Sequence, residues 1–444
     1  MMNRTHCIVF ALLAAGAMVA QAGEWGEEGQ KLSESCRHNP FSEPASIGGC
    51  AAFLFNSGTP LRFTMPQSVV PGGGTALGVM LAQPLPVKNW ADSNLTMDAG
   101  SSLREFWFAD ATATFSHKAF GGDWNTARDR FQVQAYAHAR GLPLMPFYGI
   151  GPNTQRADLT DFGERDVWGG AGVFVPLKSW MAVGSGVEYR STRINGISDP
   201  AARSIDTYYT EATAPGLTRQ PGFAHYRVFA QPRREWRWTH VYSQADYSLY
   251  QDLDTGHYSF RRFRLDYLQK IYPERQKETT GGGTGTRTQP NHDSVLYIAG
   301  RFTASGTSRG NVVPFYLQET IGGSDIDNDP TLRGFQDYRF RGPDLFSIQA
   351  QYERRLLPAA ASGDISTVRK IAGALGIMAF YDTGEVATRV SDLSFGELRH
   401  SFGFGLTFWS GERVWFRAYV GLGSGEGRHP FFGVNNPSSQ PLHL

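Results

Sequence analysis

The sequence predicts an all-β protein: a transmembrane antiparallel β-barrel of about 16 strands. Three observations support this: the composition, a period-2 alternation of polarity, and strand-like segments that recur at regular intervals. Aromatic residues make up 13% of the chain and 51 residues are glycine, yet the mean hydropathy is only −0.33. A chain that is rich in aromatic residues without being hydrophobic overall is typical of strands with one apolar and one polar face.

The alternation is clearest in three segments, 130–140, 401–408 and 414–420. In the first of them, one side carries Phe131, Val133, Ala135 and Ala137, and the other carries Gln132, Gln134, Tyr136, His138 and Arg140. A helix, with 3.6 residues per turn, would not sort these residues into two faces. Segments of this kind recur about every 20 to 25 residues, which predicts about 16 strands, an even number as in bacterial barrels.

Alternation also occurs in soluble β-sandwiches, which bury the apolar face inside, so further features are needed to favour a membrane barrel. Aromatic residues lie near the ends of the predicted strands, as in interfacial girdles: Trp107, Trp168, Trp180, Tyr189, Tyr267 and Trp409. The turn at 410–412 is tight, whereas 191–235, 270–293 and 318–343 are long and polar, and we expect these three to be outward loops. Because lipid does not tolerate an open sheet edge, we expect a closed barrel.

The first 22 residues have the pattern of a cleaved secretory signal. Arg4 gives a positive start, an apolar run extends from Cys7 to Val19, and Ala20-Gln21-Ala22 is a small-x-small cleavage site. We therefore expect an exported outer-membrane protein with a signal peptide (1–22), a short periplasmic segment (23–70), the barrel (71–436) and a polar tail (437–444). The alternative is an uncleaved N-terminal anchor.

Two cysteines, Cys36 and Cys50, are expected in the mature chain. An even pair in an oxidising compartment predicts one disulfide ahead of the barrel, and two unpaired thiols are the alternative. The pair lacks the C-x-x-C spacing of a zinc site, so we expect no metal and no cofactor. The net charge of +1 and the lack of a basic tail give no reason to expect a nucleic-acid partner.

Four motifs between Gly322 and Val434 follow one another in a recognisable order. They are Leu332-Arg333-Gly334-Phe335 with Asp337-Tyr338-Arg339-Phe340-Arg341-Gly342, then Gln349-Ala350-Gln351-Tyr352-Glu353-Arg354, Phe380-Tyr381-Asp382-Thr383-Gly384, and Leu398-Arg399-His400-Ser401-Phe402-Gly403. In this order they resemble the BamA/TamA superfamily, also called the bacterial surface antigen family. Phe147-Tyr148-Gly149-Ile150-Gly151 is similar to a further element of these barrels. The resemblance implies that the sixth extracellular loop folds into the lumen with its Arg-Gly-Phe.

The residues themselves support a contact between this loop and the barrel wall. On the segment 346–353, the polar face carries Ser347, Gln349, Gln351 and Glu353, and the outward Ile377, Ala379 and Tyr381 place Asp382 inward. An inward-folded arginine would suit both carboxylates. We expect Glu353 and Asp382 to hold Arg333, with Gly384 in the same lumen wall, Gly334 permitting close backbone approach and Phe335 packing beside it. The alternative is that Arg333 is a solvated loop charge above a wet lumen.

The resemblance implies a role in inserting or translocating proteins, or in envelope assembly, at the outer membrane. Its partners would be outer-membrane lipid or lipopolysaccharide, with unfolded outer-membrane clients or a separate periplasmic protein as further candidates. Family assembly factors carry periplasmic POTRA domains, and about 48 residues before the predicted barrel are too few for one. A passive channel or structural surface barrel is therefore the alternative function.

A third possibility, an enzyme, is disfavoured, because His138, Glu188, His240 and Asp246 show no nucleophile–base–orienter pattern. The oxygen-rich segment 325–329 lacks the glycine and bidentate glutamate of a calcium loop, so a solvated acidic loop is expected there. We expect the barrel to have a weak seam between a first strand near 75–85 and a last strand near 428–434, because the glycine-rich 71–75 and the prolines Pro84 and Pro86 leave few ladder hydrogen bonds there. The alternative is that these prolines merely mark strand ends.

Overall fold

A computed structural model describes residues 61–64, 69–88, 90, 93–118, 130–199, 201–279, 286–326, 329–357, 373–410, 413–423 and 426–433. The predicted signal peptide (1–22), the cysteine pair Cys36 and Cys50, and the tail 437–444 lie outside these residues.

Sixteen strands form one antiparallel sheet, which confirms the predicted strand number. Their bounds are β1 Leu61–Thr64, β2 Ala76–Pro84, β3 Asn94–Ser102, β4 Trp107–Lys118, β5 Arg130–Phe147, β6 Thr160–Lys178, β7 Met181–Asn195, β8 Gly222–Trp236, β9 Thr239–Asp252, β10 Phe260–Ile271, β13 Ser294–Thr307, β16 Asp344–Arg355, β17 Leu375–Ala387, β18 Arg399–Ser410, β19 Arg413–Gly423 and β20 Gly427–Gly433. Each strand pairs with the one before it in this order, as in an up-and-down meander.

Two small hairpin sheets and a few helical turns complete the fold. β11 (Arg275–Thr279) pairs with β12 (Thr286–Pro290), and β14 (Glu319–Ile321) pairs with β15 (Phe340–Gly342). The helical turns are η2 (Arg156–Asp158), α4 (Ile205–Tyr208), η3 (Phe315–Leu317) and η4 (Val390–Asp392). None of the helices in the described ranges combines the length and the apolar character needed to traverse a bilayer.

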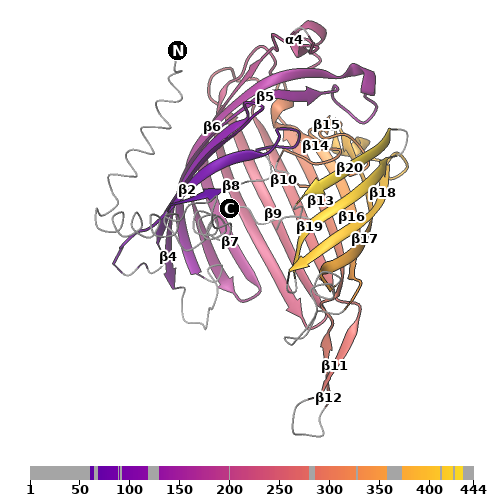
Figure 1. Cartoon of the computed structure of the whole chain (residues 1–444). Helices are drawn as coiled ribbons and strands as arrows, with labels where there is room; N and C mark the ends of the chain where they lie inside the picture. The colour runs from indigo at the N-terminus through magenta and orange to yellow at the C-terminus, as the bar shows by residue number, and fades with distance from the viewer. Residues whose placement is uncertain are drawn as a thin grey trace, which may run out of the picture.

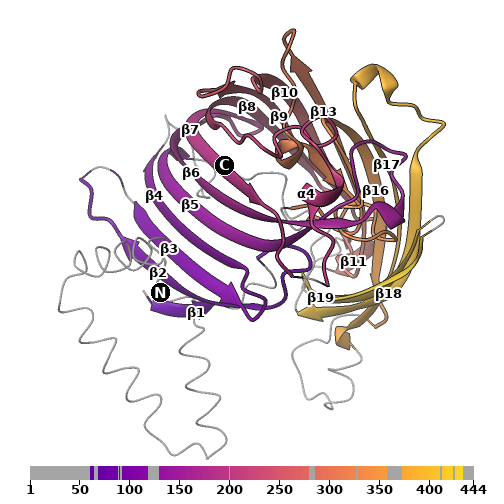
Figure 2. The same ribbon diagram turned by 90° about the horizontal axis from the view of Figure 1, so that it is seen from above.

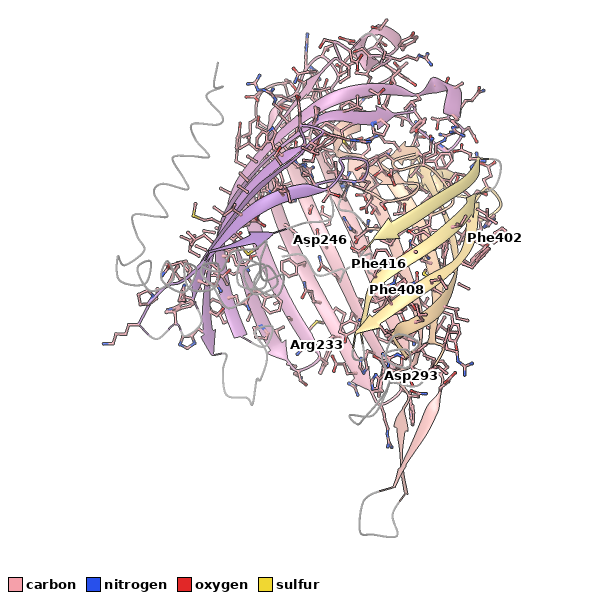
Figure 3. The ribbon with its side chains drawn as sticks, viewed as in Figure 1. Arg233, Asp246, Asp293, Phe402, Phe408 and Phe416 are labelled. Carbon is pink, nitrogen blue, oxygen red and sulfur yellow. The ribbon has the colours of Figure 1, made fainter. Side chains whose placement is uncertain are left out.

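The faces of the large sheet are inverted relative to a soluble protein. On β18, Phe402 and Phe404 are 56% and 64% exposed on the outer side, whereas Ser401 on the inner side is fully buried. β17 repeats the pattern, with Tyr381 exposed and Asp382 buried. Figure 3 shows Phe402 pointing away from the curved sheet while Asp246 lies within it. An apolar outside and a polar inside are what a lipid-embedded barrel requires.

The sheet curls around a central space, and its two ends approach the same side of the molecule (Figures 1 and 2). Its edges are β1 and β20, and no pairing joins these two strands within the described ranges. The described residues form one 16-stranded sheet whose hydrogen-bonded order runs from β1 to β20, and closure of this sheet into a barrel stays a prediction.

The sheet begins earlier than predicted, because β1 (Leu61–Thr64) belongs to it although it lies in the segment assigned to the periplasm. The reason is that β1 is only four residues long, too short to show an alternating pattern of its own. The first strand of the seam is therefore β1 and not the segment near 75–85. The last strand, β20 (Gly427–Gly433), agrees with the prediction within one residue.

Connections alternate between the two ends of the sheet because successive strands run in opposite directions. One end carries α4 and the connection 308–343, and the other carries the β11–β12 hairpin (Figure 1). The connection 308–343 is the sixth at its end and is called loop 6 below. The prediction that 270–293 and 318–343 are both outward is wrong, because the single strand β13 between them places them at opposite ends.

Two of the predicted girdle residues also face inward. Trp168 stacks on His138 with 5.0 Å between ring centroids, and the Arg140 and Arg190 guanidiniums lie over its ring. Trp409 is 5% exposed and donates from Nε1 to the Thr407 hydroxyl, next to an irregularity in the β18–β19 register. Register sets which face a residue occupies, and a one-residue shift reverses it.

Candidate functional site

Loop 6 is folded into the lumen around a compact apolar cluster. The β14–β15 hairpin is extended by two hydrogen bonds between Gly323 and the backbone of 331–332. The cluster contains Ile321, Leu332, Phe335, Phe340, Leu345 and Val386, so it joins the loop to the first residues of β16 and the last of β17. Gly323 has φ of +55°, and a Cβ there would lie 2.2 Å from Asp337 Oδ1. The described part of loop 6 is thus packed closely against the inner wall of the sheet.

Arg333, at the tip of this loop, is 4% exposed and contacts Asp382 through three donors. Its Nε donates to Oδ2 at 2.9 Å, its Nη2 to Oδ1 at 2.5 Å, and its backbone N–H to Oδ2 at 3.0 Å. The Ser401 hydroxyl also donates to Oδ2. The guanidinium lies 3.7 Å from the centroid of Phe380. Burial lowers the pKa of Arg333 and Asp382 raises it, with a net rise, so the guanidinium stays charged.

The backbone at Gly334 touches the backbone of β19. A Cβ on Gly334 would lie 2.3 Å from the Gly423 nitrogen, and a Cβ on Gly421 would lie 2.3 Å from the Arg333 carbonyl oxygen. Real Cβ contacts are never this short. The loop tip and the strand therefore need glycine on both sides of the contact, as predicted for Gly334 alone. Phe335 is 2% exposed and makes an edge contact with Phe340.

Glu353 does not contact Arg333, so that part of the predicted site is wrong. Its carboxylate accepts from Arg417 Nε at 2.6 Å and from Gln351 Nε2 at 2.7 Å. Gln351 also accepts from Arg333 Nη1 through its Oε1, and so links the two arginine–carboxylate pairs. The reason is that the Glu353 carboxylate pairs with Arg417, which lies on the inner face of β19.

Gly384 lies in the same wall without touching the loop tip. A Cβ there would lie 2.8 Å from the Phe346 carbonyl and 3.0 Å from the Ser347 side chain, so the glycine serves the packing of β17 on β16. Sequence reasoning missed Arg417 and the glycines of β19 as parts of the site. Their inward alternation was visible, but β19 lies three strands away from β16, and only the curvature of the sheet brings them together.

A second arginine holds loop 6 from the wall side. Arg301 on β13 donates to Asp325 at 2.6 Å and to Asp329 at 2.9 Å in the loop, and to Asp266 on β10 at 2.7 Å. Asp325 and Asp329 are buried, so the solvated acidic loop expected for 325–329 is wrong where the structure describes it. No group of acidic, histidine or cysteine side chains within the described ranges is arranged to hold a metal ion.

Loop 6 also connects the two ends of the sheet. Arg339 donates to Glu426, in the β19–β20 turn, at 2.7 Å, and to the Thr154 hydroxyl, in the β5–β6 connection, at 2.8 Å. The Tyr338 hydroxyl donates to the Pro71 carbonyl, in the β1–β2 connection, at 3.4 Å. One loop therefore touches elements beside both edge strands.

A cavity of about 520 Å³ lies beside the loop tip. It is lined by Pro71, Gly72, Arg104, Phe106, Leu144, Pro146, Tyr148, Leu159, Asp161, Gly323, Ser324, Arg333, Phe335, Gln336, Asp337, Tyr338 and Tyr419. Burial raises the pKa of Asp337 to about 6, and the hydrogen bond from the Ser324 N–H lowers it by less.

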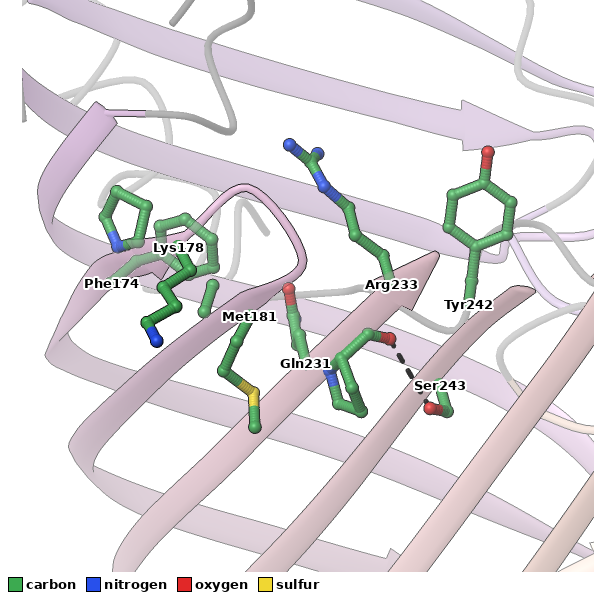
Figure 4. Close-up of a pocket in the computed structure, with 10 residues that line it drawn as sticks. Phe174, Lys178, Met181, Gln231, Arg233, Tyr242 and Ser243 are labelled. Atoms are coloured by element: carbon green, nitrogen blue, oxygen red, sulfur yellow. Dashed lines mark hydrogen bonds between the residues drawn. The ribbon is translucent and has the colours of Figure 1, made fainter. Parts of the chain in front are cut away.

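A second, much smaller pocket lies between the ends of β6 to β9. It measures only about 20 Å³ and is lined by Phe174, Arg233 and Ser243 among others (Figure 4). That space holds about one water molecule, so it is no candidate site.

Comparison with known proteins supports the architecture. No protein-family model matches the sequence, and a search of curated proteins gives no match. Among solved structures, BamA from Haemophilus ducreyi lacking POTRA domains 1–3 aligns over 91% of this chain and 80% of its own, with 10% identity and a TM-score of 0.52. CdiB from Escherichia coli aligns over 82% of this chain and 59% of its own, with 11% identity and a TM-score of 0.49. The chain therefore has the fold of a BamA-type barrel.

Proposed function

We propose that this chain is an outer-membrane barrel of the BamA/TamA type that acts in protein insertion or translocation, or in envelope assembly. The observation that carries the proposal is loop 6, fastened by Arg333 to Asp382 and touching elements beside both edge strands. Such a loop would control how far the β1 and β20 edges separate. The proposal assigns the chain no catalytic step.

The seam between β1 and β20 is a weak place in the sheet. β1 offers four residues for pairing and β20 seven, whereas β5 and β6 have 18 and 19. Pro430 in β20 has no N–H to donate. An edge with unpaired backbone groups is a template for an added strand, and an extended client segment would bind there by β-augmentation.

The pair of Arg333 and Asp382 would keep this edge from opening without a client. Both residues are almost fully buried, and removing one partner of such a pair leaves an unpaired charge at a cost of about 3–5 kcal/mol. Loop 6 would thus be held in the lumen at rest. A client that displaces it must supply comparable free energy from its own strand pairing.

The apolar outer face suits a sheet that lies in lipid, with outer-membrane lipid or lipopolysaccharide as its surroundings. We assign the α4 and loop 6 end to the outside of the cell and the β11–β12 end to the periplasm, which fits a sixth loop that is extracellular. Unfolded outer-membrane proteins or a separate periplasmic protein would meet the chain at the periplasmic end.

Depletion of the protein in its own host tests the proposal. An assembly factor should leave other outer-membrane barrels unfolded or degraded, which heat-modifiability on gels would detect, and the parent gene should restore them while Arg333→Ala does not. A passive channel would instead change only permeability. Normal barrel levels after depletion, together with a large steady conductance that Arg333→Ala does not alter, would overturn the proposal in favour of the channel.

A further inference from the structure

A row of nitrogen donors crosses the outer face of the sheet near its loop 6 end. Trp107 on β4 lies opposite Gly141 on β5, Gly141 lies opposite Arg165 on β6, and Arg165 lies opposite Arg193 on β7. The four residues therefore form one continuous cross-strand line. Strands are about 4.8 Å apart, so the line spans about 14 Å.

All members of the row belong to the lipid-facing side. Arg165 and Arg193 are exposed, whereas their inward neighbours Asp166 and Thr192 are buried. Gly141 leaves room for the indole of Trp107, because a Cβ at that glycine would lie 2.1 Å from Trp107 Nε1. The indole N–H thus lies over Gly141, on the side of the neighbouring Arg165.

These donors have no acceptor within the described part of the chain. Arg165, Arg193 and Trp107 Nε1 make no hydrogen bond or ion pair there. Asp161 is the next outward carboxylate along β6, four residues away, which corresponds to about 13 Å of strand. Two like charges directly opposite each other on neighbouring strands destabilise a sheet, so an anion from outside the chain that binds both arginines would stabilise this arrangement.

The row also marks one boundary of an uncharged band. On β6, the outward residues after Arg165 are Val167, Gly169, Ala171, Val173, Val175 and Leu177, and on β7 the outward residues from Ser191 back to Met181 carry no charge. The twelve residue-to-residue steps of tilted strand from Arg165 to Leu177 cover about 30 Å along the membrane normal. That is the thickness of a hydrocarbon core, so the donors lie at the level of lipid phosphates.

We propose that Trp107, Arg165 and Arg193 bind the phosphate groups of a membrane glycolipid of the lipopolysaccharide class. Guanidinium groups bind phosphate through paired, charge-assisted hydrogen bonds, and an indole N–H at the interface adds a neutral donor. The choice of glycolipid over phospholipid rests on the proposed function, which assigns the loop 6 end to the outer leaflet. The site itself depends only on the sheet lying in lipid.

Binding to the purified, detergent-solubilised protein tests the site without any assembly assay. The probes are bisphosphorylated lipid A, the same lipid after removal of its phosphates, phosphatidylglycerol and inorganic phosphate, with native mass spectrometry and lipid-induced thermal shift as the readouts. We expect lipid A to bind the parent protein, and Arg165→Gln with Arg193→Gln to weaken it at least tenfold.

Arg261 supplies the matched control. It is an exposed outward arginine at the same end of the sheet, but its neighbours across the strands are Leu249 and Gly306. Arg261→Gln should leave lipid A binding within about twofold of the parent, while removing the same charge as either site variant. Without lipid, Arg165→Gln should raise thermal stability slightly, because it relieves the repulsion from Arg193.

Three results would overturn the inference. Equal lipid A binding by the parent and the double variant would show that the two arginines do not bind the lipid. Equal binding of lipid A and its dephosphorylated form would show that the phosphate groups are not recognised. Phosphatidylglycerol binding as tightly as lipid A would overturn the glycolipid assignment. A protein that binds lipid A here but whose depletion leaves other barrels intact would refute the proposed function and leave this site standing.

Discussion

At the scale of the residue, the chain depends on buried charges that satisfy one another. Arg333, Asp382 and Gln351 form one group, and Arg417 and Glu353 continue it along the inner wall of the sheet. A buried ion pair adds little net stability relative to an apolar pair, but losing one partner is costly. These residues therefore fix where the loop tip docks more than they stabilise the barrel as a whole.

Arg333→Ala and Asp382→Ala should each destabilise the folded protein by about 3–5 kcal/mol, because each leaves the other charge buried and unpaired. The double variant should cost much less than the sum of the two. Urea unfolding in detergent, analysed as a double-mutant cycle, measures this coupling. Additive losses would show that Arg333 and Asp382 do not act as a pair.

Asp337 should make loop 6 sensitive to pH. Its pKa is raised by burial from 3.8 to about 6, so the folded state binds the proton more tightly than the unfolded chain. The contribution of Asp337 to stability is therefore largest below about pH 4 and is lost as the pH rises through about 6. Asp337→Asn mimics the protonated form and keeps the acceptor for the Ser324 N–H. The variant should be more stable than the parent at neutral pH. Its stability should also lack the decrease that Asp337 causes in the parent between about pH 4 and 7, as measured by unfolding at both pH values.

At the scale of the element, loop 6 and β19 fit together only because glycines face each other. Gly334 and Gly421 each leave space that a methyl group would fill with a backbone clash. Backbone atoms cannot move aside as a flexible side chain can. The alternation of β19 showed which residues face inward, but not that a loop would lie on them.

Gly421→Ala should displace the loop tip without changing any charge. We expect limited proteolysis in detergent to cut the variant in the region 322–342, where the parent is protected. Gly300→Ala is the matched control, because it changes a strand glycine whose Cβ would meet only an ordinary contact of 3.5 Å. Equal protection of the Gly421→Ala variant and the parent would contradict the close contact.

At the scale of the whole molecule, one inverted sheet carries a loop that touches elements beside both of its edges. Contacts of Arg339 and Tyr338 reach the β19–β20 turn, the β5–β6 connection and the β1–β2 connection. Movement of the loop is therefore coupled by contact to both sides of the seam. If opening requires loop 6 to leave its place, fastening the loop should stop it.

A reversible cross-link between Thr331→Cys in the loop and Gln349→Cys on β16, made with a short bifunctional methanethiosulfonate reagent, provides such a fastening, since the contact of Gln349 Nε2 with the Thr331 carbonyl at 2.8 Å places the two residues within reach of the reagent. The cross-linked variant should fail to support assembly of other barrels in depleted cells, and a reductant should restore most of the activity. Each single cysteine variant is the control. Full activity of the cross-linked protein would show that the loop need not move.

The strand number, the alternation of faces and the inward Asp382 could all be predicted from the order of residues, because period 2 and residue polarity are local properties of the chain. Other features arise only when the chain folds: Glu353 pairs with Arg417, Arg301 holds Asp325 and Asp329, and 270–293 lies opposite loop 6. These depend on sheet curvature, on strand direction and on which of several inward charged side chains lies close enough to pair with a given partner. They could not be predicted from the spacing of neighbouring residues, because each depends on contacts between segments far apart in the sequence.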